Sequence, residues 1–294
     1  MELELWAETS AAISAVARGW ERHWGDRHST ALIVRVYHWA CLHDRPVTWA
    51  CERSNWKPSA RPAVLPSQST MSRRTRRADY ELFLKRVGER MNGKTEPRVV
   101  KVIDGHALEL PNHTTDRNAT WGRGVSRMSV GYKIHAIFSG NPMPDAFAVT
   151  TLNVCEKQMA RRLIPRVGGF GYLPGDSHYD ASWLFDLCHG HHHQLVCPRS
   201  RPGTGEGHHY VSPHRRRAIG MLEMSSRMNR FGRDLYAQRT NIERDFSQMA
   251  GFSAGLGPLP TWVRRIWRVR HWTFNKLLIN AARIRINRKK AANA

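Results

Sequence analysis

The chain has 294 residues, of which 41% are hydrophobic, 9% aromatic and 24% charged. This composition excludes a wholly disordered, collagen-like or low-complexity protein, and the length suits a main domain of roughly 150–200 residues with smaller additions. Lysine and arginine number 46 against 24 acidic residues, a net charge of +22, so a polyanionic partner is expected. Nucleic acid suits the planar guanidinium of the many arginines better than a lipid surface does.

Three features of the sequence bear on where the protein works. The first residues, MELELWAETS, lack the basic and apolar regions of a signal peptide. The best apolar run, ALIVRVYHWACL, is short and contains Arg35, so it does not suit a membrane span. The five cysteines never form a CxxC pair, which is typical of reduced thiols. We therefore expect a cytoplasmic protein with no membrane partner.

Residues 1–92 are predicted to be a helical DNA-binding region. Apolar residues recur at helical spacing through residues 1–46, and a further helix is predicted from the capping residues Ser67 and Ser69 onward. In its middle this helix carries four arginines, Arg73, Arg74, Arg76 and Arg77. A basic second helix is the pattern of a DNA-reading helix-turn-helix, although the Pro-rich connection is longer than usual. A solvated basic linker helix is the alternative.

Residues 98–250 change to an α/β pattern. Hydrophobic patterning predicts, in chain order, strands at 98–105, 130–140 and 147–154, a helix at 156–167, a strand at 168–176, a helix at 181–190 and a strand at 194–200. Residues at about 199–228 are rich in Arg, Gly and His and are expected to form a loop, after which a helix resumes at Arg230.

Residues 258–294 are predicted to form a C-terminal basic amphipathic helix and tail, with the helix running from Trp262 to about Ile286. Its aromatic stripe is expected to pack on a core, while its arginines face solvent or contact a DNA backbone. The segment CHGHHHQLVC holds residue types that bind zinc, but adjacent histidines rarely reach one ion together, so a polar loop is favoured there.

Three acidic residues stand where a metal-binding triad of carboxylates needs them. Asp104 ends the first predicted strand, Asp176 follows a later strand, and Glu243 lies in the helix that begins at Arg230. Two Mg²⁺ ions that clamp a phosphate require oxygen ligands that converge from separate elements. Composition alone supports this weakly, because an aspartate at a strand end usually caps a turn.

The helix carries a more specific signal. Tyr236, Arg239 and Glu243 are spaced three and four residues apart, so they share one helical face. A tyrosine, an arginine and a carboxylate on one face could contact DNA backbone, phosphate and metal. The alternative is an Arg239–Glu243 ion pair on a solvated surface, with Tyr236 as half-buried packing.

These motifs resemble the DDE transposases of bacterial insertion sequences, in particular insertion-sequence family four. The third-acid region of that family follows Y-(2)-R-(3)-E-(6)-K, which is matched by Tyr236, Arg239 and Glu243. The second-acid region is similar to G-D-x-x-Y-D, and the first acid ends a strand, as in VIDG. The similarity covers about residues 98–285. The sequence departs from the pattern at Ala250, where the family has the lysine expected to grip DNA.

The resemblance implies an RNase H-like fold, a mixed five-stranded sheet flanked by helices, for residues 98–250. It implies that Asp104, Asp176 and Glu243 hold two Mg²⁺ ions, which Mn²⁺ can replace, and that Tyr236 and Arg239 contact phosphates near the cut end. The implied reaction is hydrolysis of phosphodiester bonds at the ends of a mobile element, followed by strand transfer of the 3′-OH into target DNA.

The implied partners are double-stranded DNA, namely the terminal inverted repeats and the target, and a second copy of the chain in a homodimer assembled on DNA. The implied location is the bacterial cytoplasm, associated with the nucleoid. Two alternatives remain open. The chain could be a catalytically decayed or domesticated DNA-binding protein, or an RNase H-like nuclease that acts on RNA or hybrids.

Overall fold

The computed structural model describes residues 1–21, 23–93, 98–111, 113–201, 211–223, 230–240, 246, 249, 251–252 and 254–293. The chain folds into two compact units. One unit combines residues 1–94 with residues 249–294, and the other contains residues 95–248. Each unit is described by itself below.

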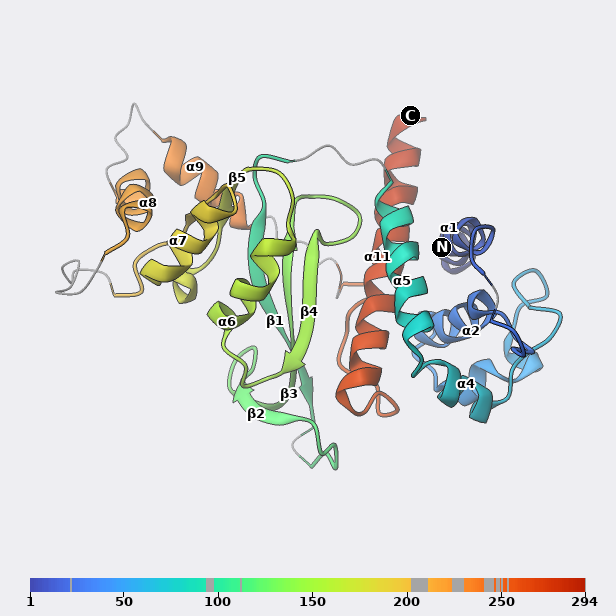
Figure 1. The fold of residues 1–294 in the computed structure, drawn as a ribbon. Helices are drawn as coiled ribbons and strands as arrows, with labels where there is room; N and C mark the ends of the chain where they lie inside the picture. Colours follow the sequence, from blue (N-terminus) through green and yellow to red (C-terminus); the bar gives the residue numbers. More distant parts are fainter. Residues whose placement is uncertain are drawn as a thin grey trace. The chain divides into compact units, whose positions relative to one another are not determined.

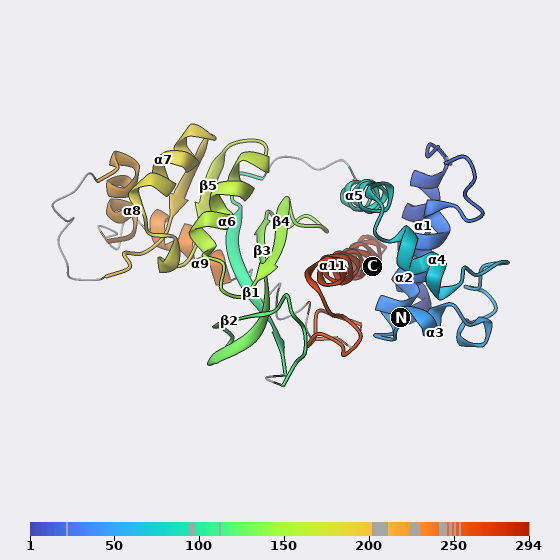
Figure 2. The ribbon, with the colours of Figure 1, turned by 60° about the horizontal axis from the view of Figure 1, so that its bottom comes forward.

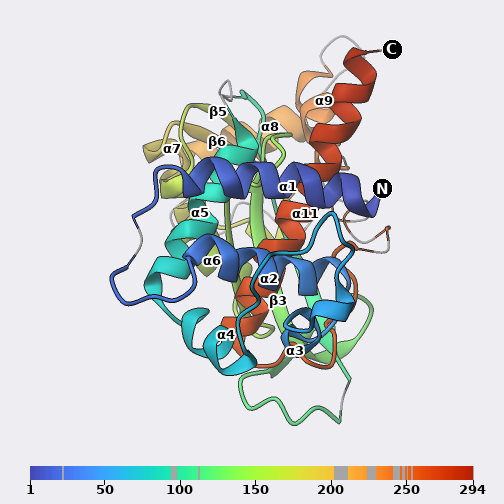
Figure 3. The same ribbon diagram turned by 90° about the vertical axis from the view of Figure 1, so that its right-hand side faces the viewer.

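The first unit is helical. Its elements are α1 (Glu2–Ala17), α2 (Thr30–Leu42), α3 (Val47–Ala50), the 3-10 turn η1 (Arg53–Asn55), α4 (Gln68–Arg74), α5 (Ala78–Asn92) and α11 (Ile266–Ala292). Helices α5 and α11 pack side by side, seen almost along their axes in Figure 2. Helices α1 and α2 cross them (Figure 3). The N-terminal and C-terminal segments therefore share one core.

Local capping and buried polar pairs hold this unit together. The hydroxyls of Ser29 and Ser67 accept the amide hydrogens of Leu32 and Thr70, which fixes the starts of α2 and α4. In the core, the fully buried Lys276 lies 2.8 Å from the Asp44 carboxylate and donates a hydrogen bond to a backbone carbonyl, so its charge is compensated.

Two helix predictions in this unit are wrong in their extent. The predicted helix from Ser67 through the arginines is split, because α4 ends at Arg74 and Arg77 takes an extended backbone before α5. The Arg77 guanidinium there pairs with Asp26 and Asp79, which holds the break in place. Helix α1 ends at Ala17, and Trp24, an apolar residue within the predicted helical span 1–46, is fully exposed.

The second unit is built on β-strands. Its strands are β1 (Val102–Leu110), β2 (Thr120–Arg123), β3 (Met128–Phe138), β4 (Ala146–Thr151), β5 (Gly171–Pro174) and β6 (His193–Val196). Strand β3 pairs antiparallel with β1 along one edge and with β2 and then β4 along the other. Strands β5 and β6 form a parallel pair. A parallel bridge from Val100 to Tyr172 connects the start of β1 to β5.

Helices cover this unit. They are α6 (Glu156–Leu163), η2 (Ile164–Arg166), η3 (Ser177–Tyr179), α7 (Ser182–Gly190), α8 (Pro213–Glu223) and α9 (Phe231–Ala237). Helix α6 lies against β3 and β4 (Figure 1). Its apolar residues Ala160 and Leu163 join Ile103 and Ile137 of the sheet in one buried cluster. Apolar burial of this kind contributes about 25 cal/mol per Å², so α6 is fixed by its apolar face and keeps its N-terminus at the sheet.

The mixed α/β architecture is confirmed, while several details differ from the sequence predictions. Strand β2 was not predicted, and Asp104 is the third residue of β1 rather than its last. Helix α8 occupies part of the predicted loop at 199–228. The C-terminal helix begins at Ile266 rather than Trp262, because Arg265 has a φ of 69°, outside the helical range. Within the described residues, no helix is both long and apolar enough to cross a bilayer.

Candidate active site

Asp104 lies on β1, with its side chain largely covered by neighbouring residues. Its carboxylate accepts a hydrogen bond of 2.8 Å from the backbone N–H of Gly105. Burial raises the pKa of Asp104 to about 7, and the negative charges of Asp176 and Glu156 act in the same direction. The Gly105 hydrogen bond and the positive charge of Arg239 oppose this rise of the pKa. Asp104 is therefore surrounded by like charges that a cation would compensate.

Asp176 sits at the turn that follows β5. It caps η3, accepting the backbone N–H of His178 at 2.9 Å, and its other carboxylate oxygen lies 3.0 Å from His178 Nδ1. The side chain keeps 28% of its surface exposed. Asp176 thus combines the expected turn-capping role with a carboxylate that faces an open groove.

Glu156, which the sequence analysis did not select, brings a third carboxylate to this place. It is the first residue of α6, and its Oε1 lies 2.7 Å from Lys133 Nζ of β3. A Cβ atom on Gly105 would lie 3.1 Å from the same oxygen, so the absence of a side chain at Gly105 lets Glu156 approach β1. The sequence signal was an acidic residue at the start of the helix that follows the third predicted strand.

These residues form a group that suits a divalent cation. One ligand atom from each of Glu156, Asp176 and His178 lies within 4.8 Å of the others. Asp104 stands beside this group, as its pKa shift by the charges of Glu156 and Asp176 indicates. Carboxylate oxygens from separate elements are the ligands that Mg²⁺ and Mn²⁺ prefer. Within the residues that the structure describes, no other group has this geometry.

A groove of about 840 Å³ runs past these acids. Its walls come from β1, the β2–β3 hairpin, the segment between β4 and α6, and the turn after β5, and they include Asp104, Lys133, Glu156, Asp176 and His178. The groove is open to solvent rather than enclosed. The site is therefore an acidic cluster along an open groove.

Tyr236 and Arg239 lie close to the same acids. The Arg239 guanidinium sits over the Tyr236 ring at 5.8 Å from its centroid. Burial raises the pKa of Tyr236, with a contribution from the charge of Asp176, while Arg239 opposes the rise. Because Arg239 also lowers the pKa of Asp104, the structure brings Tyr236, Arg239, Asp104 and Asp176 together. Two other predicted positions, Glu243 and Ala250, lie outside the described residues.

Phe246 contacts the strand that carries Asp104. Its ring stacks on His106 with 5.1 Å between centroids and meets Phe138 edge-on. His106 lies two residues after Asp104 on β1, so both side chains belong to one face of the strand. Phe246 is buried against that face.

Asp180, the second aspartate of the G-D-x-x-Y-D motif, has a different environment. It is buried and pairs with Arg215 of α8 through two bonds of 2.6 and 2.9 Å. It also accepts the backbone N–H of Ser200 at 2.9 Å. These bonds outweigh burial and hold the pKa of Asp180 below its usual range. Asp180 therefore stabilises the join between α8 and the turn that carries Asp176.

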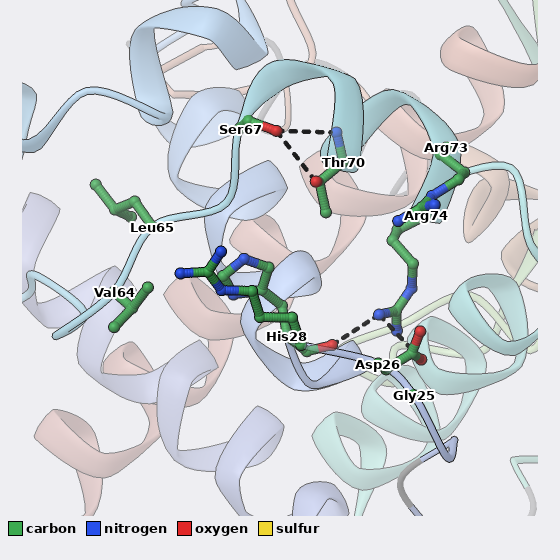
Figure 4. Close-up of a pocket in the computed structure, with 10 residues that line it drawn as sticks. Gly25, Asp26, His28, Val64, Leu65, Ser67, Thr70, Arg73 and Arg74 are labelled. Atoms are coloured by element: carbon green, nitrogen blue, oxygen red, sulfur yellow. Dashed lines mark hydrogen bonds and ion pairs between the residues drawn. The ribbon is translucent and has the colours of Figure 1, made fainter.

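The four arginines predicted to bind DNA fall into two groups. Arg73 and Arg76 are exposed, and Arg76 also lies over the Trp267 ring at 5.2 Å. Arg74 is only 3% exposed, pairs with Asp26 and Asp79, and donates to the carbonyl of His28 at 2.7 Å (Figure 4). Arg77 pairs with the same two aspartates. Arg74 is thus a structural residue, and a direct DNA contact through it would require breaking these bonds.

The exposed Arg73 borders a cavity of about 340 Å³ between α4 and the segment before α2 (Figure 4). Ser67 and Thr70 line the same cavity, joined by hydrogen bonds at the start of α4. The cavity lies in the helical unit and is not part of the acidic groove.

The His- and Cys-rich segment does not form a metal group in the structure. The His189 and His214 rings stack with centroids 3.7 Å apart, and His193 Nδ1 lies 2.6 Å from the carbonyl oxygen of His191. Cys188 and Cys197 are buried, and burial raises the pKa of the Cys188 thiol to about 12. None of the side chains of this segment belongs to a metal-binding group in the described part of the chain, so packing explains this segment.

Comparison with known proteins gives a family. Residues 95–256, more than half of the chain, match the family model described as transposase DDE domain. No curated protein matches the sequence. Among solved structures, a cryo-EM structure of the piggyBac transposase synaptic complex with hairpin DNA is similar at a TM-score of 0.36 and 12% sequence identity. The match covers 70% of this chain and 49% of that one, so the chain spans about half the length of that transposase.

Proposed function

Because the chain belongs to the transposase DDE-domain family, we propose that it is a DNA transposase that cuts the ends of a mobile element and joins them to target DNA. The observation that carries this proposal is the convergence of Asp104, Asp176 and Glu156 at one groove inside the segment that matches the family. We place the chain in insertion-sequence family four and in bacteria, on the motifs around Asp176 and Tyr236.

The proposal includes an RNase H-like arrangement of five strands. Pairing in the sheet supports the order β4, β3, β1, β5, β6, with the Val100–Tyr172 bridge linking β1 to β5. In this arrangement β3 is antiparallel to β1, while β5 and β6 run parallel to β1. The short strand β2 is then an addition beside the first residues of β3.

We propose that the acidic group holds a pair of Mg²⁺ ions, or Mn²⁺ in their place. The raised pKa of Asp104 shows that neighbouring charges and burial leave its negative charge poorly compensated. Hard oxygen donors with uncompensated charge favour divalent cations over water. Asp104 and Asp176 would hold the ions, with Glu156 and His178 beside them.

Glu243 completes the proposed ligand set. In the sequence it stands four residues after Arg239 and three before Phe246. Of the described residues on either side of it, Arg239 lowers the pKa of Asp104, and Phe246 stacks on His106, two residues along β1 from Asp104. We therefore assign the third carboxylate of the triad to Glu243.

The reaction proposed is an in-line displacement at phosphorus. Bound divalent cations would supply Lewis-acid stabilisation of the phosphate and a lowered pKa of attacking water. The carboxylates of Asp104 and Asp176 would hold these cations in place, while Arg239 and Tyr236 hold phosphates next to the cut bond. Hydrolysis breaks the bond between phosphorus and the leaving 3′-oxygen, which departs as a 3′-OH. That hydroxyl then attacks a phosphorus of target DNA, and a target oxygen leaves.

The proposed partners follow from the same reaction. They are the terminal inverted repeats, the target duplex and a second copy of this chain in a homodimer on DNA, in the nucleoid region of the cytoplasm. We propose residues 1–92 as the end-binding region, 98–250 as the catalytic domain and 258–294 as a basic helix that supports them. Arg73 and Arg76 are the exposed arginines that suit backbone contacts in the first region.

Cleavage of a labelled duplex carrying the ends of the encoding element tests this function. The unmodified chain should nick the end with Mg²⁺ or Mn²⁺ and not with EDTA. Asp176→Asn should abolish nicking while leaving DNA binding intact. Asp145→Asn is the matched control, because Asp145 accepts a hydrogen bond from Asn141 outside the acidic group. Binding without nicking under either metal would instead support a decayed DNA-binding protein.

A further inference from the structure

We propose that the β2–β3 hairpin is a duplex-contacting surface, in which Trp121 packs into a DNA groove about six base pairs from the bond that is cut. The inference rests on the proposed function, because it takes the acidic group as the point of cutting. Its occupant is double-stranded DNA.

The hairpin exposes apolar side chains to solvent. Trp121 keeps 58% of its surface exposed, Val125 73% and Met128 59%. These three lie within eight residues of one another, and all of them line the groove that contains Asp104 and Asp176. Clustered exposed apolar residues are typical of contact surfaces. An aromatic side chain has few rotatable bonds, so ordering it against a ligand costs little entropy.

The hairpin is held in one conformation before any ligand arrives. Four register pairs join β2 to β3, from Thr120–Gly131 to Arg123–Met128. Beyond them, the Gly124 N–H donates to the carbonyl of Arg127 at 2.8 Å and the Val125 N–H donates to Glu109 at 2.6 Å.

A close approach at the base of the hairpin adds to this rigidity. A Cβ on Gly122 would lie 2.7 Å from the Leu152 backbone, so β2 presses against the segment after β4. Rigid presentation of Trp121 lowers the entropy cost of binding.

The charge of the hairpin matches a phosphate backbone. The segment 117–135 contains Arg117, Arg123, Arg127 and Lys133 and no acidic residue. The three arginines are exposed, whereas Lys133 is paired with Glu156. Arginines beside apolar residues are the combination that minor-groove binding proteins use, with cations on phosphates and apolar groups against sugars and base steps. The charge therefore favours DNA over an apolar protein partner.

The strand register gives the distance to the acids. Asp104 pairs with Ala136 and Trp121 pairs with Val130, so the two register pairs lie six residues apart along β3. Paired residues project to the same face of a sheet, and six residues of strand span about 20 Å. At about 3.4 Å per base pair, this is the length of about six base pairs of duplex. Figure 1 shows β2 paired with the part of β3 beyond β4.

Hydroxyl-radical footprinting of the full chain on the labelled element-end duplex tests the inference, because this probe reads sugars in the minor groove. The unmodified chain should protect a patch about six base pairs from the nicking site. Trp121→Ala should lose that patch while protection nearest the cut persists, and Trp121→Phe should retain most of it. Trp183→Ala is the matched control, since Trp183 is also exposed and lies on α7, which lines no part of the groove.

A salt titration provides the second readout. Arg123→Ala combined with Arg127→Ala should lower the slope of log K against log salt by about two. If the unmodified chain nicks the duplex but Trp121→Ala keeps the distal patch and the slope is unchanged, the inference is wrong and the proposed function stands. If the unmodified chain neither binds nor nicks the duplex, both are wrong. A change of oligomeric state with Trp121→Ala and an unchanged footprint would make the hairpin a protein contact and overturn the inference.

Discussion

Lys133 on β3 and Glu156 at the start of α6 form an ion pair with 2.7 Å between Nζ and Oε1. Both side chains are largely covered, and Glu156 contributes to the raised pKa of Asp104. The pair therefore places one fixed positive charge within a group of three carboxylates. It connects the sheet to the helix N-terminus at the candidate site.

Removal of this charge should make the fold more dependent on a divalent cation. Lys133→Ala leaves Glu156 without its partner, so the chain should melt at a lower temperature in EDTA and gain more from added Mn²⁺ than the unmodified chain does. Thermal melts with and without Mn²⁺ measure both effects. Lys157→Ala is the control, because Lys157 donates to the backbone carbonyl of Asp180 rather than to a carboxylate. Equal Mn²⁺ shifts in the two variants would contradict the proposed role of Lys133.

Substitution of the two aspartates of the G-D-x-x-Y-D motif should have different effects, one on stability and the other on Mn²⁺ binding. Asp180→Asn breaks a buried bidentate pair with Arg215, so the free energy of unfolding should fall by about 3 kcal/mol. Asp176→Asn should change stability far less and should weaken Mn²⁺ binding instead. Denaturant unfolding and calorimetric Mn²⁺ titration provide the two measurements. A loss of Mn²⁺ binding in Asp180→Asn at a temperature where it is folded would contradict this division.

Acidic residues beside strands are recognisable in the sequence, whereas residues whose position depends on tertiary pairing are not. Asp104 and Asp176 were selected because acids beside strands are recognisable, and the structure places them together. Glu156 was missed because its position at the site depends on Lys133 and on the missing side chain at Gly105. The composition of residues 199–228 predicts a loop because basic and polar residues outnumber the apolar ones. In α8 the apolar residues Ala218 and Ile219 are nevertheless buried.

The four arginines predicted to bind DNA show the same distinction. Their spacing could not reveal that Arg74 and Arg77 are held by Asp26, because that residue is about fifty positions away in the sequence. Short elements also could not be predicted from the sequence. The four residues of β2 form a strand only because β3 extends past β4 and offers them a pairing partner.

Arg73 and Arg74 should behave oppositely on substitution, although they are adjacent. Arg74→Ala removes one of the two arginine partners of two largely buried aspartates and should lower the free energy of unfolding of the helical unit by about 3 kcal/mol. Arg73→Ala should leave stability within about 0.5 kcal/mol and should reduce the salt slope of DNA binding by about one. Denaturant unfolding and binding at several salt concentrations measure these effects. A stable Arg74→Ala protein would contradict the structural role given to Arg74.

Mild acid should destabilise the helical unit through His38. Burial lowers the pKa of His38 from 6.5 to about 4, and the charge of Lys276 adds to this effect. Asn275 donates its amide to the carbonyl of His271, so its oxygen is left to accept from His38 Nδ1 at 3.0 Å. The opposite nitrogen, Nε2, is buried and has no hydrogen-bond partner among the residues that the structure describes, so a proton there would be unsatisfied.

Proton linkage gives the direction in which the free energy of unfolding changes with pH. Between about pH 6.5 and pH 4 the unfolded chain binds a proton at this histidine and the folded chain does not, so the free energy of unfolding falls as pH falls through this window. The loss from His38 should reach about 3 kcal/mol. His38→Asn retains a donor toward Asn275 without the titration and should flatten that part of the profile. Unfolding at pH 7, 5.5 and 4 tests this, and an unchanged slope in His38→Asn would rule out His38 as the cause.

The central claim is that Asp176 binds the metal that cuts DNA, and a change of ligand tests it most directly. Cysteine at this position offers a soft thiolate, which Mg²⁺ binds poorly and Mn²⁺ binds better. The unmodified chain should nick the element-end duplex with either metal, whereas Asp176→Cys should be inactive with Mg²⁺ and regain nicking with Mn²⁺. Full activity of Asp176→Cys with Mg²⁺ would show that Asp176 does not bind the catalytic metal and would contradict the account.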